Sequence, residues 1–269
     1  MKKKTSVVLP IMLLIGLFLL LYPTVSNYWN NLHQSRAIAG YKETVSSIDK
    51  TQYDKLLAEA VKYNENINRL NISAITDAER REYYRLLDVM GTGIMGYIEI
   101  PNIGCTLPIY HGTSESVLQV ATGHIEGSSL PVGGEGSHCI ISGHRGLPSA
   151  KLFTDLDRVK EGDVFILSVL NEKLTYEVDQ ITVVEPEDVS QLTFEDGKDI
   201  CTLVTCTPYG VNSHRLLVRG HRVSNETVKI IRVTSDAAQI HRMWVTVSVC
   251  IPLVLIWLIF IIIRRKVRG

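Results

Sequence analysis

The stretch Asp199–Val223, DICTLVTCTPYGVNSHRLLVRGHRV, constrains the fold of this chain more than any other. It contains two apolar runs, Ile200–Thr205 and Arg215–Val218, and a short segment between them that holds a proline and a glycine. Apolar runs rich in β-branched residues and separated by Pro and Gly are typical of buried strands joined by a loop. The pattern therefore predicts two neighbouring strands, with Cys206 at the end of the first and Arg215 at the start of the second.

The region before this stretch has the same character. Apolar and polar residues alternate with a period of two, which indicates strands. The predicted strands are Ile94–Ile100, Thr106–Tyr110, His138–Ser142, Asp163–Leu170 and Leu174–Val184, with a tight turn at Asn171-Glu172 and short helices at Ser114–Ala121 and Ala150–Leu156. Many short strands without regular helices between them favour an all-β barrel or sandwich over a doubly wound sheet.

Residues 27–91 predict a helical arm in front of the β domain. Apolar residues at helical spacing in Tyr41–Leu70 indicate one helix, followed by an Asn-rich stretch. Thr76 followed by Glu79 forms a capping box, which opens a second helix that we expect to continue through Met90 and stop at Gly91.

Both ends of the chain carry uncharged apolar segments flanked by basic residues. Val7–Tyr22 follows three lysines and predicts a membrane anchor or a signal segment, and Met243–Ile263 precedes a basic tail and predicts a transmembrane helix. Positive charge at both extreme ends predicts cytoplasmic termini and a middle domain on the outer side. The expected division is 1–26 anchor or signal segment, 27–91 arm, 92–228 β domain, 229–242 linker, 243–263 transmembrane helix and 264–269 cytoplasmic tail.

Composition narrows the function classes. The formal net charge is zero, so nucleic acid is not an expected partner. Five cysteines in 269 residues do not make a disulfide framework, and we expect Cys105, Cys139 and Cys201 to be small buried hydrophobic residues. The spacing of the cysteines and histidines matches no zinc pattern, so we predict neither a metal nor a cofactor.

His144 follows a predicted strand and lies between Gly143 and Gly146. Glycines on either side leave room for another group to approach an imidazole on an exposed turn. A thiol becomes a better nucleophile when a histidine can hold its proton, and the reaction then needs positive charge for the developing oxyanion. His144, Cys206 and Arg215 together supply these three groups, although a cysteine alone is more often a packing residue.

The run Thr202–Gly210, TLVTCTPYG, with Asn212–Gly220, NSHRLLVRG, resembles the signature of the sortases, and most closely that of the class C, pilus-building branch. SGHR at Ser142–Arg145, GYIEIP at Gly96–Pro101 and LPIYHG at Leu107–Gly112 support the resemblance, which covers roughly residues 91–223.

The resemblance implies an eight-stranded β-barrel and a catalytic triad of His144, Cys206 and Arg215. It also implies a membrane-anchored cysteine transpeptidase of a Gram-positive cell surface. Such an enzyme would cleave a Leu-Pro-x-Thr-Gly-like sorting signal between Thr and Gly through a thioester. It would then transfer the acyl group to a lysine of another pilin subunit, so the implied partners are pilins and the membrane.

Arg219 competes with Arg215 because both have the same strand parity and would face the same side, whereas parity excludes Arg222. The family motif places its arginine nine positions after the cysteine, and 215 − 206 = 9 selects Arg215. Thr205 and Thr207, on either side of the nucleophile, are candidate substrate-binding residues.

One departure from the family pattern concerns control. Class C sortases often carry an Asp-Pro-Phe or Asp-Pro-Trp lid anchor in the arm, and no such tripeptide occurs between Asn64 and Gly91. Asn71–Asp77 is the segment that could cover the site by another contact.

Other functions remain open at this point. A housekeeping sortase would attach proteins to cell-wall peptidoglycan, and the second apolar terminus argues against it. A cysteine protease or amidase would transfer the acyl group to water, but it would need an Asn or Asp to orient the histidine. A non-catalytic binding barrel would use Cys206 only for packing.

Overall fold

The computed structural model describes residues 2–67, 75–225 and 254. Apart from residue 254, the predicted linker 229–242, C-terminal span 243–263 and basic tail 264–269 lie outside the described residues, as does most of Asn71–Asp77.

Eight strands form a closed barrel, which confirms the all-β barrel prediction. The strands are β1 (Ile94–Ile100), β2 (Cys105–His111), β3 (Thr122–His124), β4 (Ser137–Gly143), β5 (Val164–Val169), β6 (Glu172–Val184), β7 (Asp199–Thr207) and β8 (His214–Val223). Around the barrel their order is β1-β2-β3-β4-β7-β8-β6-β5, and β1 pairs with β5 to close it. The pairs β2–β3 and β4–β7 are parallel, whereas the other pairs are antiparallel.

Alternate residues of these strands serve two apolar clusters. The larger cluster fills the barrel and includes Phe165, Tyr176, Leu203 and Val218, all buried. A smaller cluster of Ile140, Leu192, Val204 and Leu217 uses the opposite parity of β4, β7 and β8, so it lies on the other face of these strands. The sheet here therefore has apolar side chains on both faces, which explains why the sequence reads as continuous apolar runs.

The structure differs from the predicted strands in two places. The three-residue strand β3 is missing from the prediction because Thr122-Gly123-His124 is too short and too polar to show a period of two. In the β5–β6 hairpin, Val169 pairs with Glu172, so the turn residues are Leu170 and Asn171, one position earlier than predicted. Leu170 adopts a left-handed φ of 51° there.

The N-terminal arm is built differently from the prediction. Helix α1 (Lys2–Ser46) is one helix that crosses the predicted boundary between anchor and arm. The single helix predicted for Tyr41–Leu70 is wrong, because α1 ends at Ser46 and α2 (Lys50–Asn66) begins after it. Asp49 begins the second helix: its side chain accepts a hydrogen bond from Gln52 N at 2.8 Å and caps α2.

The capping box predicted at Thr76 and Glu79 is present and opens α3 (Asp77–Arg85). The helix ends before the predicted stop, because Leu86 has left the helical conformation and Leu87 is left-handed with φ 62°. The remaining short helices are α4 (Glu115–Leu118), η2 (Pro101–Ile103) and η3 (Leu156–Arg158). The helix predicted at Ala150–Leu156 is wrong, since turns occupy this segment until η3 begins.

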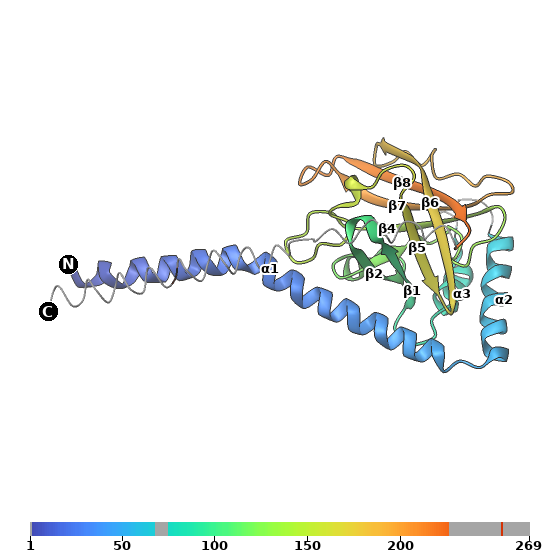
Figure 1. The fold of residues 1–269 in the computed structure, drawn as a ribbon, viewed down its shortest axis with the longest axis horizontal. Coiled ribbons are helices and arrows are strands. Elements are labelled where there is room, and N and C mark those ends of the chain that lie inside the picture. Colours follow the sequence, from blue (N-terminus) through green and yellow to red (C-terminus); the bar gives the residue numbers. More distant parts are fainter. Residues whose placement is uncertain (1, 68–74, 226–253, 255–269) are drawn as a thin grey trace. The chain divides into compact units, whose positions relative to one another are not determined.

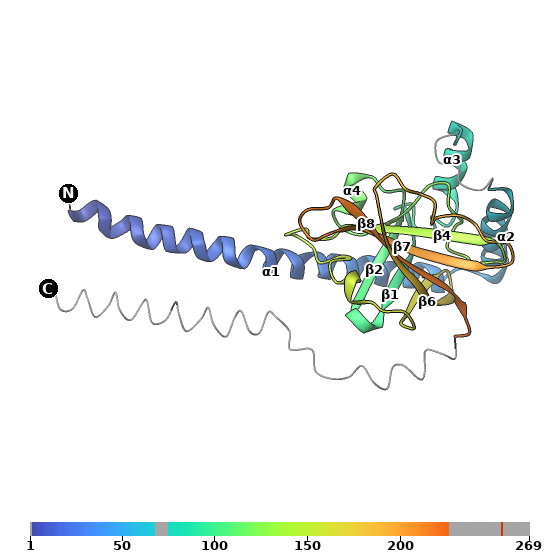
Figure 2. The same cartoon turned by 90° about the horizontal axis from the view of Figure 1, so that it is seen from above.

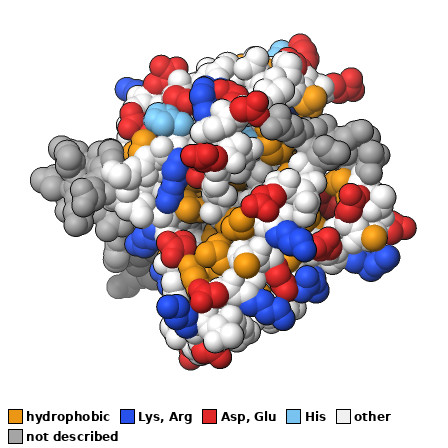
Figure 3. Space-filling view, turned by 90° about the vertical axis from the view of Figure 1, so that its right-hand side faces the viewer, with side chains coloured by type: hydrophobic (Ala, Val, Ile, Leu, Met, Phe, Trp, Pro, Cys, Tyr) orange, Lys and Arg blue, Asp and Glu red, His pale blue; other side chains and the backbone are white. Residues whose placement is uncertain are grey.

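Helix α1 continues from its apolar N-terminal part onto the barrel, where it passes beside β1 and β2 (Figures 1 and 2). Tyr41 fixes it there: its hydroxyl donates to Met95 O at 2.9 Å and accepts from Leu170 N at 2.8 Å. The helix from Ile11 to Ser46 contains an unburied window long and apolar enough to cross a membrane, a test that a signal sequence also passes. On the face that carries α2 and α3, acidic and basic side chains are intermixed (Figure 3).

Candidate active site

Strands β7 and β8 place Cys206 and Arg215 directly opposite each other, as the last pair but one of their ladder. Residues paired in this way point to the same face of a sheet, with Cβ atoms about 5 Å apart. Both side chains are half-buried. The thiol and the guanidinium therefore share one face at the end of two strands, where solvent and a substrate can reach them.

The parallel pairing of β4 with β7 brings His144 to the same end of the barrel. Two contacts continue the strand alignment. Thr205 Oγ1 donates to Gly143 O at 2.7 Å, and Arg145 Nη1 donates to Thr207 Oγ1 at 3.2 Å. His144 lies between Gly143 and Arg145 on the segment that continues β4, just as Cys206 lies between Thr205 and Thr207 on β7. The histidine and the cysteine are thus neighbours on adjacent chain segments.

The glycines around the histidine have separate structural roles. A Cβ atom on Gly143 would lie 2.6 Å from the Phe153 ring, so the ring packs where a side chain would be. Phe153 N also donates to His144 O at 3.1 Å, which holds the backbone at the candidate base. Gly146 has a φ of +80° and faces the Tyr209 ring, so this turn needs glycine for its conformation as well as for space.

The exposed carboxylate of Glu115 is the acidic group beside the candidate base. Its Oε2 lies 3.8 Å from His144 Nε2, with the histidine side chain 27% exposed and the glutamate 74% exposed. The distance is too long for a hydrogen bond, so Glu115 is a nearby carboxylate and not a direct partner of the imidazole. Sequence reasoning missed Glu115 because only the fold brings α4 next to β3, the neighbour of β4, and so close to His144.

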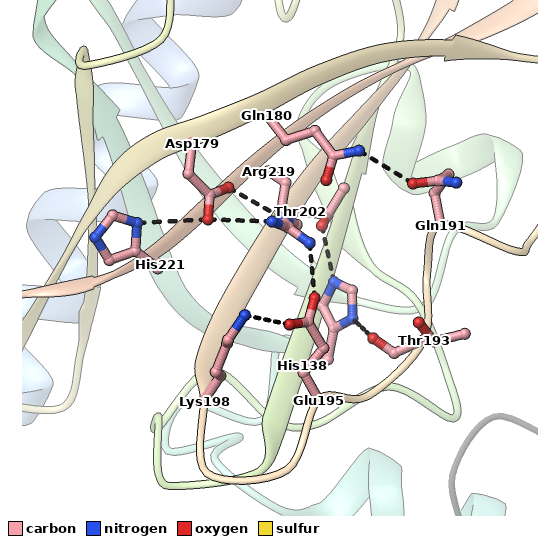
Figure 4. A network of polar contacts seen from close by, with 10 residues as sticks. All are labelled: His138, Asp179, Gln180, Gln191, Thr193, Glu195, Lys198, Thr202, Arg219 and His221. Atoms are coloured by element: carbon pink, nitrogen blue, oxygen red, sulfur yellow. Dashed lines mark hydrogen bonds and ion pairs between the residues drawn. The ribbon is translucent and has the colours of Figure 1, made fainter.

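Strand parity alone could not decide between Arg215 and Arg219, but the hydrogen-bond partners of the two side chains distinguish them. Arg219 is fully engaged: it bonds Asp179 at 2.9 and 3.3 Å and Glu195 at 2.7 Å (Figure 4). Arg215 instead donates to two backbone carbonyls, those of Asn212 and His214, at 3.3 and 3.1 Å. Among the described residues Arg215 has no ion pair, so its charge is available to an anion.

A polar network fixes the β6–β7 loop, residues 185–198, against the outer face of the barrel (Figure 4). His138 Nδ1 lies 2.8 Å from Thr193 O, and its Nε2 lies 2.8 Å from Thr202 Oγ1. A carbonyl only accepts, so Nδ1 carries the proton, and Nε2 accepts from the threonine hydroxyl. Burial lowers the pKa of His138, which keeps this tautomer neutral.

The loop covers part of an apolar surface that leads to the candidate nucleophile. Leu192 of the loop packs on Ile140, Val204 and Leu217, the smaller apolar cluster described above. Val204 and Leu217 each lie two positions from Cys206 and Arg215 respectively, so they share the same face. All four side chains are buried, so this cluster supports the loop next to the strand ends that carry the candidate site.

Thr205 and Thr207 have the same parity on β7 but differ in burial. Thr205 is 2% exposed and its hydroxyl bonds Gly143 O, so we expect it to align β7 with the histidine segment rather than to touch a substrate. Thr207 is half-buried on the Arg145 side chain, which also pairs with Asp157. Arg145 is a site residue without an assigned role in the sequence interpretation, although it belongs to the quoted SGHR motif.

The other described cysteines differ from Cys206 in their surroundings. Burial raises the pKa of Cys105 to about 12 and raises that of Cys201 as well. Cys139 and Cys201 pair across β4 and β7 and are both buried. Among the described residues, no three His, Cys, Asp or Glu side chains come together to hold a metal ion.

Known proteins share this domain. The family model described as "Sortase domain" matches residues 98–223. Sortase C1 from Streptococcus agalactiae is 54% identical with a TM-score of 0.69, covering 71% of this chain and 99% of its own. Sortase C from Streptococcus pneumoniae is 46% identical with a TM-score of 0.65, covering 70% and 97%.

Sortase D from Bacillus subtilis is 31% identical over 132 residues, which span 48% of this chain and 64% of that protein. The chain thus matches somewhat less than two thirds of this curated relative's length. The two solved structures, by contrast, are covered almost completely at high identity. The chain therefore belongs to the sortase family of cysteine transpeptidases, and its structural relatives place it among the class C sortases.

Proposed function

We propose that this protein is a pilin polymerase, with Cys206 as nucleophile, His144 as general acid and base, and Arg215 as the group that stabilises the oxyanion. The observation that carries the proposal is the shared position of these residues. Cys206 and Arg215 are a direct cross-strand pair, and His144 follows β4, the parallel neighbour of the cysteine strand.

In the first half-reaction the Cys206 thiolate attacks the carbonyl carbon between Thr and Gly of an LPXTG-like sorting signal. Arg215 lies opposite the thiol and supplies positive charge for the tetrahedral oxyanion. The C–N bond then breaks, His144 gives its proton to the leaving glycine amine, and a thioester remains on Cys206.

In the second half-reaction the amine of a pilin lysine attacks the thioester carbonyl. The amine passes a proton to His144, the C–S bond breaks, and an amide joins two pilin subunits. The related sortase C of S. pneumoniae has pilin substrate specificity, which supports pilins as the substrate class here.

The proposal includes the location of the enzyme. The apolar part of α1 would anchor the chain in the cell membrane and hold the catalytic domain on the extracellular face. A sorting signal tethered in the same membrane would then meet the site at a raised effective concentration. The C-terminal segment 243–263 would provide a second span.

The test incubates the full-length chain, in detergent, with a sorting-signal peptide and a pilin that carries an acceptor lysine. Mass spectrometry should find the acyl group on Cys206 and then on the pilin lysine, and Cys206→Ala should give neither. Absence of the thioester would contradict the transpeptidase chemistry. A thioester that passes only to water or to a peptidoglycan amine would contradict pilin polymerisation and support hydrolysis or a housekeeping role.

A further inference from the structure

Helix α1 has a polar stripe that faces the barrel. Asn27, Asn30, Gln34 and Tyr41 each bond a backbone group outside the helix, and their spacings of three, seven and fourteen positions from Asn27 place them on one side. This side becomes more buried along the helix, from half-buried at the two asparagines to 1% exposed at Tyr41. The barrel is therefore attached to α1 over several turns.

The two asparagines bond the segment that follows His144. Asn30 Nδ2 donates to Ser149 O at 2.7 Å, and Asn27 Oδ1 accepts from Lys151 N at 2.8 Å. One asparagine thus acts as a donor and the other as an acceptor. Both partners are backbone groups, so the contacts hold the path of the chain and not a particular side chain.

That path begins at the candidate base. The segment after His144 returns to it, because Phe153 N donates to His144 O, and the two asparagine contacts hold the far side of this loop. Leu152, beside one of the held positions, has a left-handed φ of 38°. A leucine adopts this conformation at an energetic cost, so contacts from outside the loop must maintain it.

The asparagines lie close to the end of the apolar part of α1. They follow Tyr22 by five and eight positions (27 − 22 and 30 − 22), which is about 8 and 12 Å along a helix axis. Tyr22, Tyr28 and Trp29 are exposed around them. Exposed aromatic residues of this kind are enriched at membrane–water interfaces.

We propose that Asn27 and Asn30 are positioning residues for the reaction, which hold the His144 loop from the first turns of α1 beyond its apolar segment. The inference rests on the proposed catalytic role of His144. The N-terminal anchor then has a second role besides tethering, since the helix that enters the membrane also fixes the segment carrying the catalytic base.

The test measures kcat and KM for a sorting-signal peptide with the full-length chain reconstituted in phosphatidylglycerol-containing vesicles. Asn30→Ala and Asn27→Ala should each lower kcat by about tenfold with KM nearly unchanged, because small displacements of a catalytic group are costly. Asn31→Ala is the matched control: Asn31 is an exposed neighbour on α1 without a hydrogen bond among the described residues, and its variant should match the unmodified chain.

Aspartate variants separate positioning from a general effect on folding. Asn27→Asp keeps the acceptor oxygen for Lys151 N and should restore most of kcat, whereas Asn30→Asp replaces the donor with an anion facing Ser149 O and should behave like the alanine variant. Equal effects of the two aspartates, full kcat in Asn30→Ala, or a loss in Asn31→Ala would overturn the inference. His144→Ala is run in parallel, since an active His144→Ala would instead overturn the proposed function.

Discussion

At the residue scale, two arginines on the same face of β8 have different surroundings. Arg219 has carboxylate partners and Arg215 has only backbone carbonyls. Sequence parity placed both on one side, and only the folded β6–β7 loop, which supplies Glu195, shows that one of them is already engaged. Substitution of Arg215 therefore tests the stabilisation of the oxyanion, and the matched substitution of Arg219 tests the attachment of the β6–β7 loop.

Replacing Arg215 by lysine should lower kcat/KM by a factor of roughly 10² to 10³, because the forked guanidinium donors to the oxyanion are lost. The urea midpoint should hardly change. Arg219→Lys should do the reverse, with a free energy of unfolding lower by roughly 1 to 2 kcal/mol and a smaller loss of activity. Steady-state kinetics and urea titration of both variants provide the check, and equal losses of activity would contradict the assignment.

The described cysteines should also differ in reactivity. Cys206 is half-buried at a strand end, whereas Cys139 and Cys201 are inside the barrel and burial raises the pKa of Cys105 to about 12. We expect iodoacetamide to alkylate Cys206 in the native protein and the other three only after unfolding. Peptide mapping by mass spectrometry measures this, and native labelling of Cys139 would contradict the packing described here.

At the element scale, the β6–β7 loop depends on the neutral form of a buried histidine. His138 donates to Thr193 O and accepts from Thr202, while Arg219 and Glu195 act on it with opposite signs. Because burial lowers its pKa in the folded state, its contribution to stability is complete above the ordinary pKa of 6.5. The contribution is lost as the pH falls from that value toward the folded-state pKa.

The unmodified chain should therefore lose thermal stability on acidification from about pH 7.5 to about pH 5.5. His138→Asn keeps a donor for Thr193 O but has no group that titrates in this range. Its Tm should be lower at neutral pH and should fall less on acidification. Differential scanning calorimetry at both pH values tests the difference between the two proteins, and parallel curves would exclude His138 as a source of the pH dependence.

At the scale of the whole molecule, the strands of the barrel and the residues of the site were largely predictable because they depend on local patterns. Alternation and continuous apolar runs marked seven of the eight strands, and the spacing from Cys206 selected Arg215. Glu115, Asn27 and Asn30 were not predictable, because their roles depend on which elements pack together. The end of α3 at Arg85 was missed for a related reason, since the left-handed Leu87 follows from tertiary packing and no glycine marks it.

The membrane arrangement gives a prediction for the full chain. If both apolar termini span the membrane, a peptide tag added after Gly269 should be protected from protease added outside intact cells, while the barrel remains accessible. Permeabilising the cells should expose the tag, and the same tag on a chain ending at residue 242 serves as the control for an outside position. Cleavage of the first tag in intact cells would exclude the two-span topology.

Closure of the barrel also determines how an extended peptide can be recognised. Each of the eight strands has a hydrogen-bonded neighbour on both sides over part of its length, so most of the sheet offers no edge to which a sorting signal could add as another strand. Main-chain pairing would accept many sequences, whereas side-chain contacts depend on the identity of each substrate residue. Selectivity for one pilin over another should therefore follow from the side chains at the ends of β7 and β8 and from the loop between β6 and β7. It can change while the backbone of the barrel stays the same.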